Sequence, residues 1–155
     1  MKAYGIELSL NKGLANVDIE SYVKKLKIPN FRGVFMRDTL LINPKKVECA
    51  VVNLNTSNEI GSHWVCLAKI GKSRIYFDSF GQDVPLEIMK YLKTSKEYKN
   101  GVAVIARNTD IVQRVNTYVC GYLCLFVLTS LTREHLSYQQ VLDKLNDGFE
   151  QNTAL

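Results

Sequence analysis

The chain has 155 residues, a net charge of +5 and the apolar content of an ordinary soluble protein. This length suits one domain with a real core, so we expect a single domain over residues 1–155 and no extensive disorder. The longest apolar run, Tyr118 to Leu128, is too short to span a bilayer, and the first ten residues do not resemble a secretion signal. These features favour a protein of the cell interior without a membrane anchor. The mild positive charge permits contact with nucleic acid but does not indicate it.

The first part of the chain predicts one helix followed by two strands. Asn16 is a candidate N-cap for an amphipathic helix, and Pro29 is expected to end it. Strands are then predicted over Val34–Ile42 and Cys49–Leu54, separated by the turn-forming residues Asn43-Pro44.

The middle of the chain predicts a β-hairpin. Its strands, His63–Ile70 and Arg74–Ser79, flank the turn-forming residues Gly71–Ser73. In an antiparallel hairpin the start of the first strand lies beside the end of the second. His63 should therefore lie near Asp78.

The second half of the chain predicts three helices and one strand. Asp83 could cap a helix over Val84–Leu92, and Val102–Ala106 reads as a short buried strand. A buried helix follows over Cys120–Leu131. Ser137 and Gln140 then form a capping box for a last helix over about Tyr138–Asn146. Strands in the middle with helices at both ends predict an α+β fold with a central mixed or antiparallel sheet.

Cys120 is the most informative residue, because it lies where a polar segment gives way to this apolar helix. A thiol at a helix N-terminus is near unpaired N–H groups and the positive end of the helix dipole, and both favour the thiolate. The other cysteines, Cys49, Cys66 and Cys124, lie in apolar runs and are expected in the core. The spacing of the four matches neither a zinc ribbon nor a Cys-x-x-Cys redox pair, so no metal site is expected.

The hairpin register decides whether His63 and Asp78 share a face of the sheet. If Lys69 pairs with Lys72, His63 lies opposite Asp78. If Ile70 pairs with Ser73, Asp78 lies opposite the residue two places beyond His63, on the same face. A shift by one residue would separate them. The alternative is an ordinary cross-strand polar contact. The chain has only one other histidine, His135, which is expected on the surface between two helices.

Five segments in this order resemble the adenain-type cysteine proteases, the maturation proteases of adenoviruses, over about residues 20 to 130. They are Phe31–Phe35, Val47–Asn53, Gly61–Trp64, Phe77–Gly81 and the spacing from Gln113 to Cys120-Gly121. The wider group of similar proteins includes proteases that remove ubiquitin-like modifiers. The resemblance implies the same fold, with the nucleophile at the start of a buried helix.

The resemblance implies a role for each matching residue. Cys120 would be the nucleophile, His63 the general base and Asp78 the residue that orients His63. Gln113 would donate to the oxyanion together with the N–H of Cys120. Trp64 would line or shield the substrate groove, with a core tryptophan as the alternative. Gly121 would let the substrate backbone approach, with simple flexibility at the helix start as the alternative.

The resemblance also implies partners and a location. Substrates would be viral capsid or other structural precursors cut after Gly-containing motifs, in the virion or the host-cell interior, by a monomer. The chemistry requires no cofactor. DNA and an activating peptide are candidate activators, but Gly101–Val104, where the family carries the cysteine that bonds the peptide, has no cysteine.

Three other functions remain open from the sequence. The same residues would serve a protease for ubiquitin- or SUMO-like modifiers, or an acyltransferase that uses the same catalytic groups. A binding protein that retains the fold without catalysis is the third. Cleavage of a modifier fusion, acetyl transfer without hydrolysis, or full function after Cys120→Ala would identify each in turn.

Overall fold

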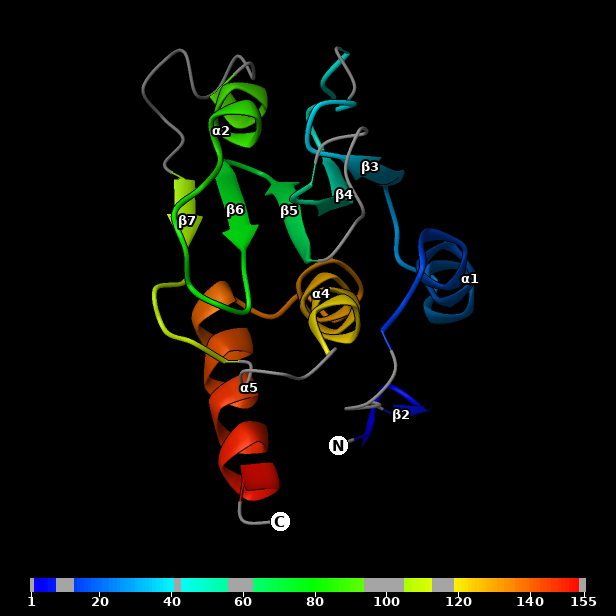
Figure 1. The fold of residues 1–155 in the computed structure, drawn as a ribbon, viewed down its shortest axis with the longest axis vertical. Helices are drawn as coiled ribbons and strands as arrows, with labels where there is room; N and C mark the ends of the chain where they lie inside the picture. The colour runs from blue at the N-terminus through cyan, green and yellow to red at the C-terminus, as the bar shows by residue number, and fades with distance from the viewer. Residues whose placement is uncertain are drawn as a thin grey trace.

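The computed structural model describes residues 2–7, 13–40, 43–55, 63–93, 105–112 and 119–153. Their main feature is a five-stranded mixed sheet with helices on both faces (Figure 1). The predicted α+β fold with a central mixed sheet is confirmed. Two very short strands, β1 (Lys2–Ala3) and β2 (Ile6–Glu7), form a separate antiparallel pair near the N-terminus.

The strands of the main sheet follow their order in the sequence, β3 to β7. The outer pairs β3/β4 and β6/β7 are parallel, and the inner pairs β4/β5 and β5/β6 are antiparallel. The strand bounds are β3 Phe31–Met36, β4 Glu48–Asn53, β5 Trp64–Ile70, β6 Ser73–Phe77 and β7 Ile105–Arg107. The ends of β6 and β7 and the start of β5 therefore lie at one edge of the sheet.

The three central strands are buried on both faces, which explains their nearly continuous apolar sequences. Alternate residues point to opposite faces. Cys49, Val51 and Cys66 belong to the core on the side of α4 (Cys120–Leu128). Val52 and Leu67 belong to a second core that also contains apolar residues of α2 (Leu86–Lys93). The sheet is therefore the middle layer of three.

The first helix, α1, spans Asn16–Leu26 and packs beside β3 (Figure 1). Its N-cap is Ala15, so the prediction of Asn16 as the cap is wrong. The polar side chain that bonds to the start of α1 is instead Asp18, whose carboxylate accepts a hydrogen bond from the Ala15 N–H at 2.9 Å. The helix ends where Lys27 adopts a left-handed conformation (φ 56°), two residues before Pro29.

The first predicted strand is displaced in the structure. β3 begins at Phe31 and ends at Met36, whereas Val34–Ile42 was expected. A turn follows Met36, in which the Thr39 N–H donates to the Met36 carbonyl at 3.0 Å. The polar residues Arg37–Thr39 and this local hydrogen bonding therefore end the strand at Met36.

The predicted hairpin is confirmed, with Ile70 paired to Ser73. This is the second of the two registers that place His63 and Asp78 on the same face. Both residues lie just outside the strands, because β5 begins at Trp64 and β6 ends at Phe77. Their side chains meet just beyond the paired residues of the hairpin.

The α2 helix and β7 both differ slightly from expectation. Asp83 does not cap α2, which begins at Leu86; its carboxylate instead forms an ion pair with Arg107 of β7 at 3.0 Å. The predicted strand from Val102 is described only from Ile105, because residues 101–104 lie outside the described ranges.

The last third of the chain contains the buried helix and a long terminal helix. After Leu128, α4 continues as a π-helical stretch, η1 (Thr129–Arg133). The capping box is confirmed, since the Ser137 N–H donates to Gln140 at 2.9 Å and the Gln140 N–H donates to the Ser137 hydroxyl at 3.2 Å. The final helix, α5, runs over Tyr138–Thr153 and is longer than predicted. None of the helices in the described ranges has the length and apolarity needed to cross a bilayer.

Candidate active site

Cys120 is the first residue of α4 and lies at the edge of the sheet where β5 begins. The first intrahelical bond runs from the Leu123 N–H to the Val119 carbonyl at 2.9 Å. The Cys120 N–H therefore belongs to the first turn, whose amides have no partner inside the helix. Cys120 is 7% exposed. The sulfur accepts a hydrogen bond from the backbone N–H of Trp64 at 3.4 Å. The sulfur thus lies beside a backbone donor at the start of a buried helix.

His63 and Asp78 form the closest charged contact at this edge. The distance from His63 Nε2 to Asp78 Oδ1 is 2.7 Å. The imidazole remains 13% exposed, whereas the carboxylate is nearly fully buried. Because Nε2 is engaged by the carboxylate, Nδ1 is the ring nitrogen left for the thiol of Cys120. The three residues predicted from the sequence therefore lie together, in the order thiol, imidazole, carboxylate.

The pKa of His63 is raised to about 9. Burial alone would lower this pKa, because it disfavours the charged ring. Side-chain hydrogen bonds to Asp78 and Cys120 and the charges of both groups outweigh that effect. The raised pKa favours the protonated ring of His63 at neutral pH.

The turn after β6 holds the carboxylate and one face of the imidazole. The Phe80 N–H donates to Asp78 Oδ1 at 2.9 Å, and the Phe80 ring packs on the His63 ring with centroids 4.8 Å apart. Gly81 closes the turn with φ 66°, and a Cβ there would lie 2.5 Å from the Thr109 carbonyl oxygen. Glycine is therefore required at this position on both counts.

Trp64 and Leu14, which precedes α1, form a wall of packed side chains against the start of α4. The Trp64 indole N–H donates to the carbonyl of Leu14 at 2.8 Å. A Cβ on Gly121 would lie 3.2 Å from side-chain atoms of both Leu14 and Trp64. Gly121 thus allows this wall to pack against the start of α4. Its role in binding substrate remains a prediction.

The other three cysteines are buried in the core, as predicted. Burial raises the pKa of Cys49 to about 12 and raises that of Cys124 well above its usual value. The raised pKa favours the protonated thiol at Cys49 and Cys124 at neutral pH. No cluster of three potential metal ligands occurs within the part of the chain that the structure describes.

The oxyanion residue predicted from the sequence, Gln113, lies outside the described residues, so its role stays a prediction. Sequence reasoning missed Asn108, which is buried directly after β7. Its side chain bonds to both the N–H and the carbonyl of Asp78. The only signal in the sequence was a polar residue shortly after a predicted apolar strand; the parallel pairing of β6 and β7 that gives it a role is known only from the structure.

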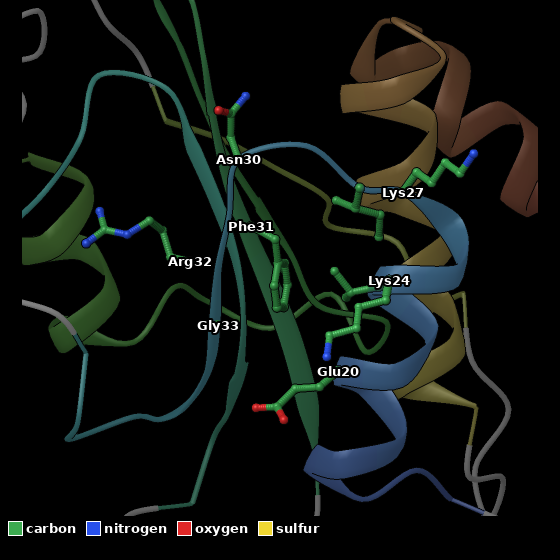
Figure 2. A pocket seen from close by; sticks show the side chains of 9 residues that line it. Glu20, Lys24, Lys27, Asn30, Phe31, Arg32 and Gly33 are labelled. Carbon is green, nitrogen blue, oxygen red and sulfur yellow. The ribbon is translucent and has the colours of Figure 1, made fainter.

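A hollow of about 520 Å³ lies between α1 and β3, away from this constellation. Figure 2 shows the Phe31 ring between helix and strand, with Glu20 and Lys24 reaching toward the same space. Neither Cys120, His63 nor Asp78 is among its described lining residues. We therefore assign the chemistry to the edge where α4 and β5 begin.

Comparisons with known proteins identify a family of similar proteins. The sequence pattern of the adenovirus endoprotease family matches residues 31–153. The protease of bovine adenovirus 2 is 29% identical over 127 aligned residues, which cover 75% of this chain and 62% of that protein. The chain thus spans about three fifths of the length of this curated relative.

Solved structures are similar in fold. The crystal structure of the ASFV pS273R protease matches with a TM-score of 0.56 and 18% identity, over 84% of this chain and 62% of that one. The SUMO protease Ulp1, with its catalytic cysteine oxidized to a sulfinic acid, matches with a TM-score of 0.47 and 17% identity, over 86% of this chain and 74% of that one. At this level of identity the likeness to the ASFV protease shows the fold alone.

Proposed function

Because this chain belongs to the adenovirus endoprotease family, we propose that it is a thiol endopeptidase with Cys120 as nucleophile. The observation that carries the proposal is the 2.7 Å contact of His63 with Asp78 beside a thiol at the start of α4. A cross-strand polar contact alone would not require a cysteine at that point. The combination supports nucleophilic catalysis.

In the first step the Cys120 thiolate attacks the scissile carbonyl. The developing oxyanion would be stabilised by the Cys120 N–H and by the side chain of Gln113. Losing one such donor typically lowers the rate by about 10²–10³. The Trp64 N–H donates to the sulfur in the resting state, so it helps to hold the thiolate until the carbonyl arrives.

In the second step the His63 imidazolium gives its proton to the leaving amine, and an acyl-enzyme remains. The neutral imidazole then takes a proton from water, whose attack on the acyl group expels the Cys120 thiolate, releases the acid product and restores the imidazolium. Asp78 stays ionised throughout. It keeps the ring oriented and stabilises its positive charge.

The proposed substrates are viral capsid or other structural precursor proteins, cut after Gly-containing motifs during maturation. The support is the family membership, since the relatives are proteases of viruses. We place the enzyme in the virion and the host-cell interior and propose that it acts as a monomer. The chemistry needs no cofactor. Activation by DNA or by a non-covalently bound peptide is compatible with the mechanism.

The substrate proposal is tested with a panel of purified substrates. One is a capsid-precursor peptide containing a Gly-Gly or Gly-X site, the second is a ubiquitin-like modifier fusion, and the third is the peptide with alanine replacing glycine. The account predicts cleavage of the first only, and none by Cys120→Ala. Faster cleavage of the modifier fusion would assign the enzyme to modifier removal. Acetyl transfer without cleavage would replace the protease proposal with an acyltransferase.

A further inference from the structure

Asn108 takes over where the pairing of β6 and β7 ends. The ladder between these parallel strands stops at Tyr76 and Arg107. Asn108 directly follows β7, and Asp78 lies two residues beyond Tyr76. Both side chains are nearly fully buried. The backbone of Asp78 therefore leaves the ladder in the interior, where its N–H and carbonyl need new partners.

The Asn108 side chain supplies both partners. Its Oδ1 accepts from the Asp78 N–H at 3.0 Å, and its Nδ2 donates to the Asp78 carbonyl at 2.6 Å. The same nitrogen donates to the Asp110 carbonyl at 3.2 Å. We propose that Asn108 is a positioning residue, which fixes the main chain of Asp78 so that its carboxylate holds His63 beside Cys120. This inference rests on the proposed function.

Only a side-chain amide of this length can make this clamp. It presents one acceptor and one donor side by side, as a peptide group does. An aspartate would direct a second acceptor at the Asp78 carbonyl. An alanine would remove the acceptor of the Asp78 N–H and leave the carbonyl with only the Gly81 N–H, which donates to it at 2.8 Å. A glutamine would be one methylene too long for a site that is already buried.

The carboxylate of Asp78 depends on this clamp because few other bonds hold it. Oδ1 accepts from both His63 Nε2 and the Phe80 N–H. Oδ2 is buried and has no hydrogen-bond partner among the described residues. The direction of the carboxylate is therefore set largely by the backbone that carries it, and Asn108 fixes that backbone.

The α5 helix supports the clamp from behind. The Tyr138 hydroxyl donates to the Tyr76 carbonyl at 2.7 Å and lies 3.4 Å from Asn108 Oδ1. The last helix thus joins the end of β6 to the residue after β7. A role for α5 in aligning the site follows.

The test is an NMR titration of the His63 ring in the full chain, in the wild type and in Asn108→Ala and Asn108→Ser. The chain has two histidines, so His135→Gln assigns the signals. In the wild type the Asp78 amide should exchange slowly with solvent. We expect the His63 pKa to fall by at least one unit in Asn108→Ala and by less in Asn108→Ser, whose hydroxyl can replace one bond. The matched control is Thr129→Val, which removes a buried hydrogen bond to the Leu125 carbonyl and should leave the His63 pKa unchanged.

Kinetics give a second readout. We expect Asn108→Ala to lower kcat about 10- to 100-fold with little change in KM, as is typical when the partner of a functional side chain is removed. In an Asp78→Asn background the same change should cost less than about threefold, because the two act through one group. Equal losses in both backgrounds with an unchanged His63 pKa would overturn the inference, as would rapid exchange of the Asp78 amide in the wild type. If the wild type cleaves no substrate but the pKa still falls, the proposed function fails and the positioning role stands.

Discussion

The sheet buries an ion pair at each of its two ends, and only one of them forms a reactive site. His63 and Asp78 lie where β5 begins, and Lys69 and Glu48 lie near where it ends. Lys69 Nζ is 3.1 Å from Glu48, and both side chains are inaccessible to solvent. In both pairs a carboxylate faces a cationic side chain on β5 or beside it.

The pairs differ in how many partners each carboxylate has. Glu48 also accepts from Arg32, from the Tyr91 hydroxyl and from the Lys45 N–H. Burial lowers the pKa of Lys69, although the hydrogen bond and charge of Glu48 act in the opposite direction. At the other end, Asp78 and Cys120 raise the pKa of His63 to about 9 against the effect of burial.

A hollow of about 510 Å³ lies beside Lys69 and Glu48. A buried ion pair beside a hollow is not by itself a sign of catalysis. What distinguishes the His63 end is a ring nitrogen left over for a thiol, at a helix N-terminus that supplies donors. At the Lys69 end, the bonds of Glu48 join β4 to β5, to the loop at Lys45 and to α2. At the other end, His63 is a group that can transfer a proton.

The strongest test of this contrast is Cys120→Ala. We expect complete loss of peptide cleavage, because no other cysteine lies beside His63, and His63→Ala should behave in the same way. Activity is measured with a purified Gly-containing peptide, and folding is checked by circular dichroism. Cleavage at the wild-type rate by Cys120→Ala would remove this end of the sheet as the active site.

Replacing Asp78 with asparagine should have the next largest effect. The neutral amide keeps the shape of the side chain but no longer stabilises the imidazolium, so kcat should fall by about 10²–10⁴. KM should change little. Steady-state kinetics with the same peptide measure this loss. An unchanged kcat in Asp78→Asn would mean that the contact between His63 and Asp78 is only an ordinary cross-strand pair.

Breaking the other pair should lower stability and leave catalysis intact. Glu48→Gln leaves Lys69 buried without its counter-charge, and the free energy of unfolding should fall by about 3–5 kcal/mol. Urea denaturation measures the change, and kcat of the folded fraction should stay within about twofold of the wild type. The double variant Glu48→Leu with Lys69→Met should lose less free energy of unfolding than Glu48→Gln, because neither charge is then left buried alone. A specific loss of kcat in Glu48→Gln would break the contrast.

The pH dependence separates the two ends further. Since the pKa of His63 is raised to about 9, kcat/KM for peptide cleavage should fall about tenfold per unit above that pH, where the proton for the leaving amine is lost. The stabilisation that comes from protonating His63 is complete below about 6.5, its ordinary value, and is lost as the pH rises through about 9. Asp78→Asn should move the falling limb to lower pH. A limb that stays in place in that variant would contradict the assignment.

The smallest effect is expected from Gly121→Ala. The new Cβ would lie 3.2 Å from Leu14 and Trp64, so the wall must shift slightly, at a cost of about 1 kcal/mol in the free energy of unfolding. Thermal denaturation measures it. Leu14→Ala should relieve part of the loss in the double variant, and an additive double variant would show that the two residues do not share this contact.

Much of the fold followed from the sequence because its signals were local. The hairpin was predictable from two apolar runs around Gly71, and the capping box from Ser137 and Gln140. The hairpin register brought His63 and Asp78 together, and the place of Cys120 at the start of a buried helix followed from the polar-to-apolar change in the sequence. Periodicity and turn chemistry determine these features without distant contacts.

The features that failed or were missed depend on other parts of the chain. Asp83 resembled a helix cap, yet Arg107 attracts its carboxylate across the loop. Asn16 resembled a cap, yet Asp18 satisfies the start of α1. Asn108 gave no motif, because its role exists only once β6 and β7 lie in parallel. Such pairings over tens of residues are not encoded in a short window of sequence.

The most direct test of the central claim is to treat the protein with a peptide electrophile that ends in Gly-Gly and to locate the adduct by mass spectrometry. The account predicts a single adduct on Cys120, and none when His63 is replaced by alanine. Labelling of Cys49, Cys66 or Cys124, or equal labelling of Cys120 without His63, would contradict it.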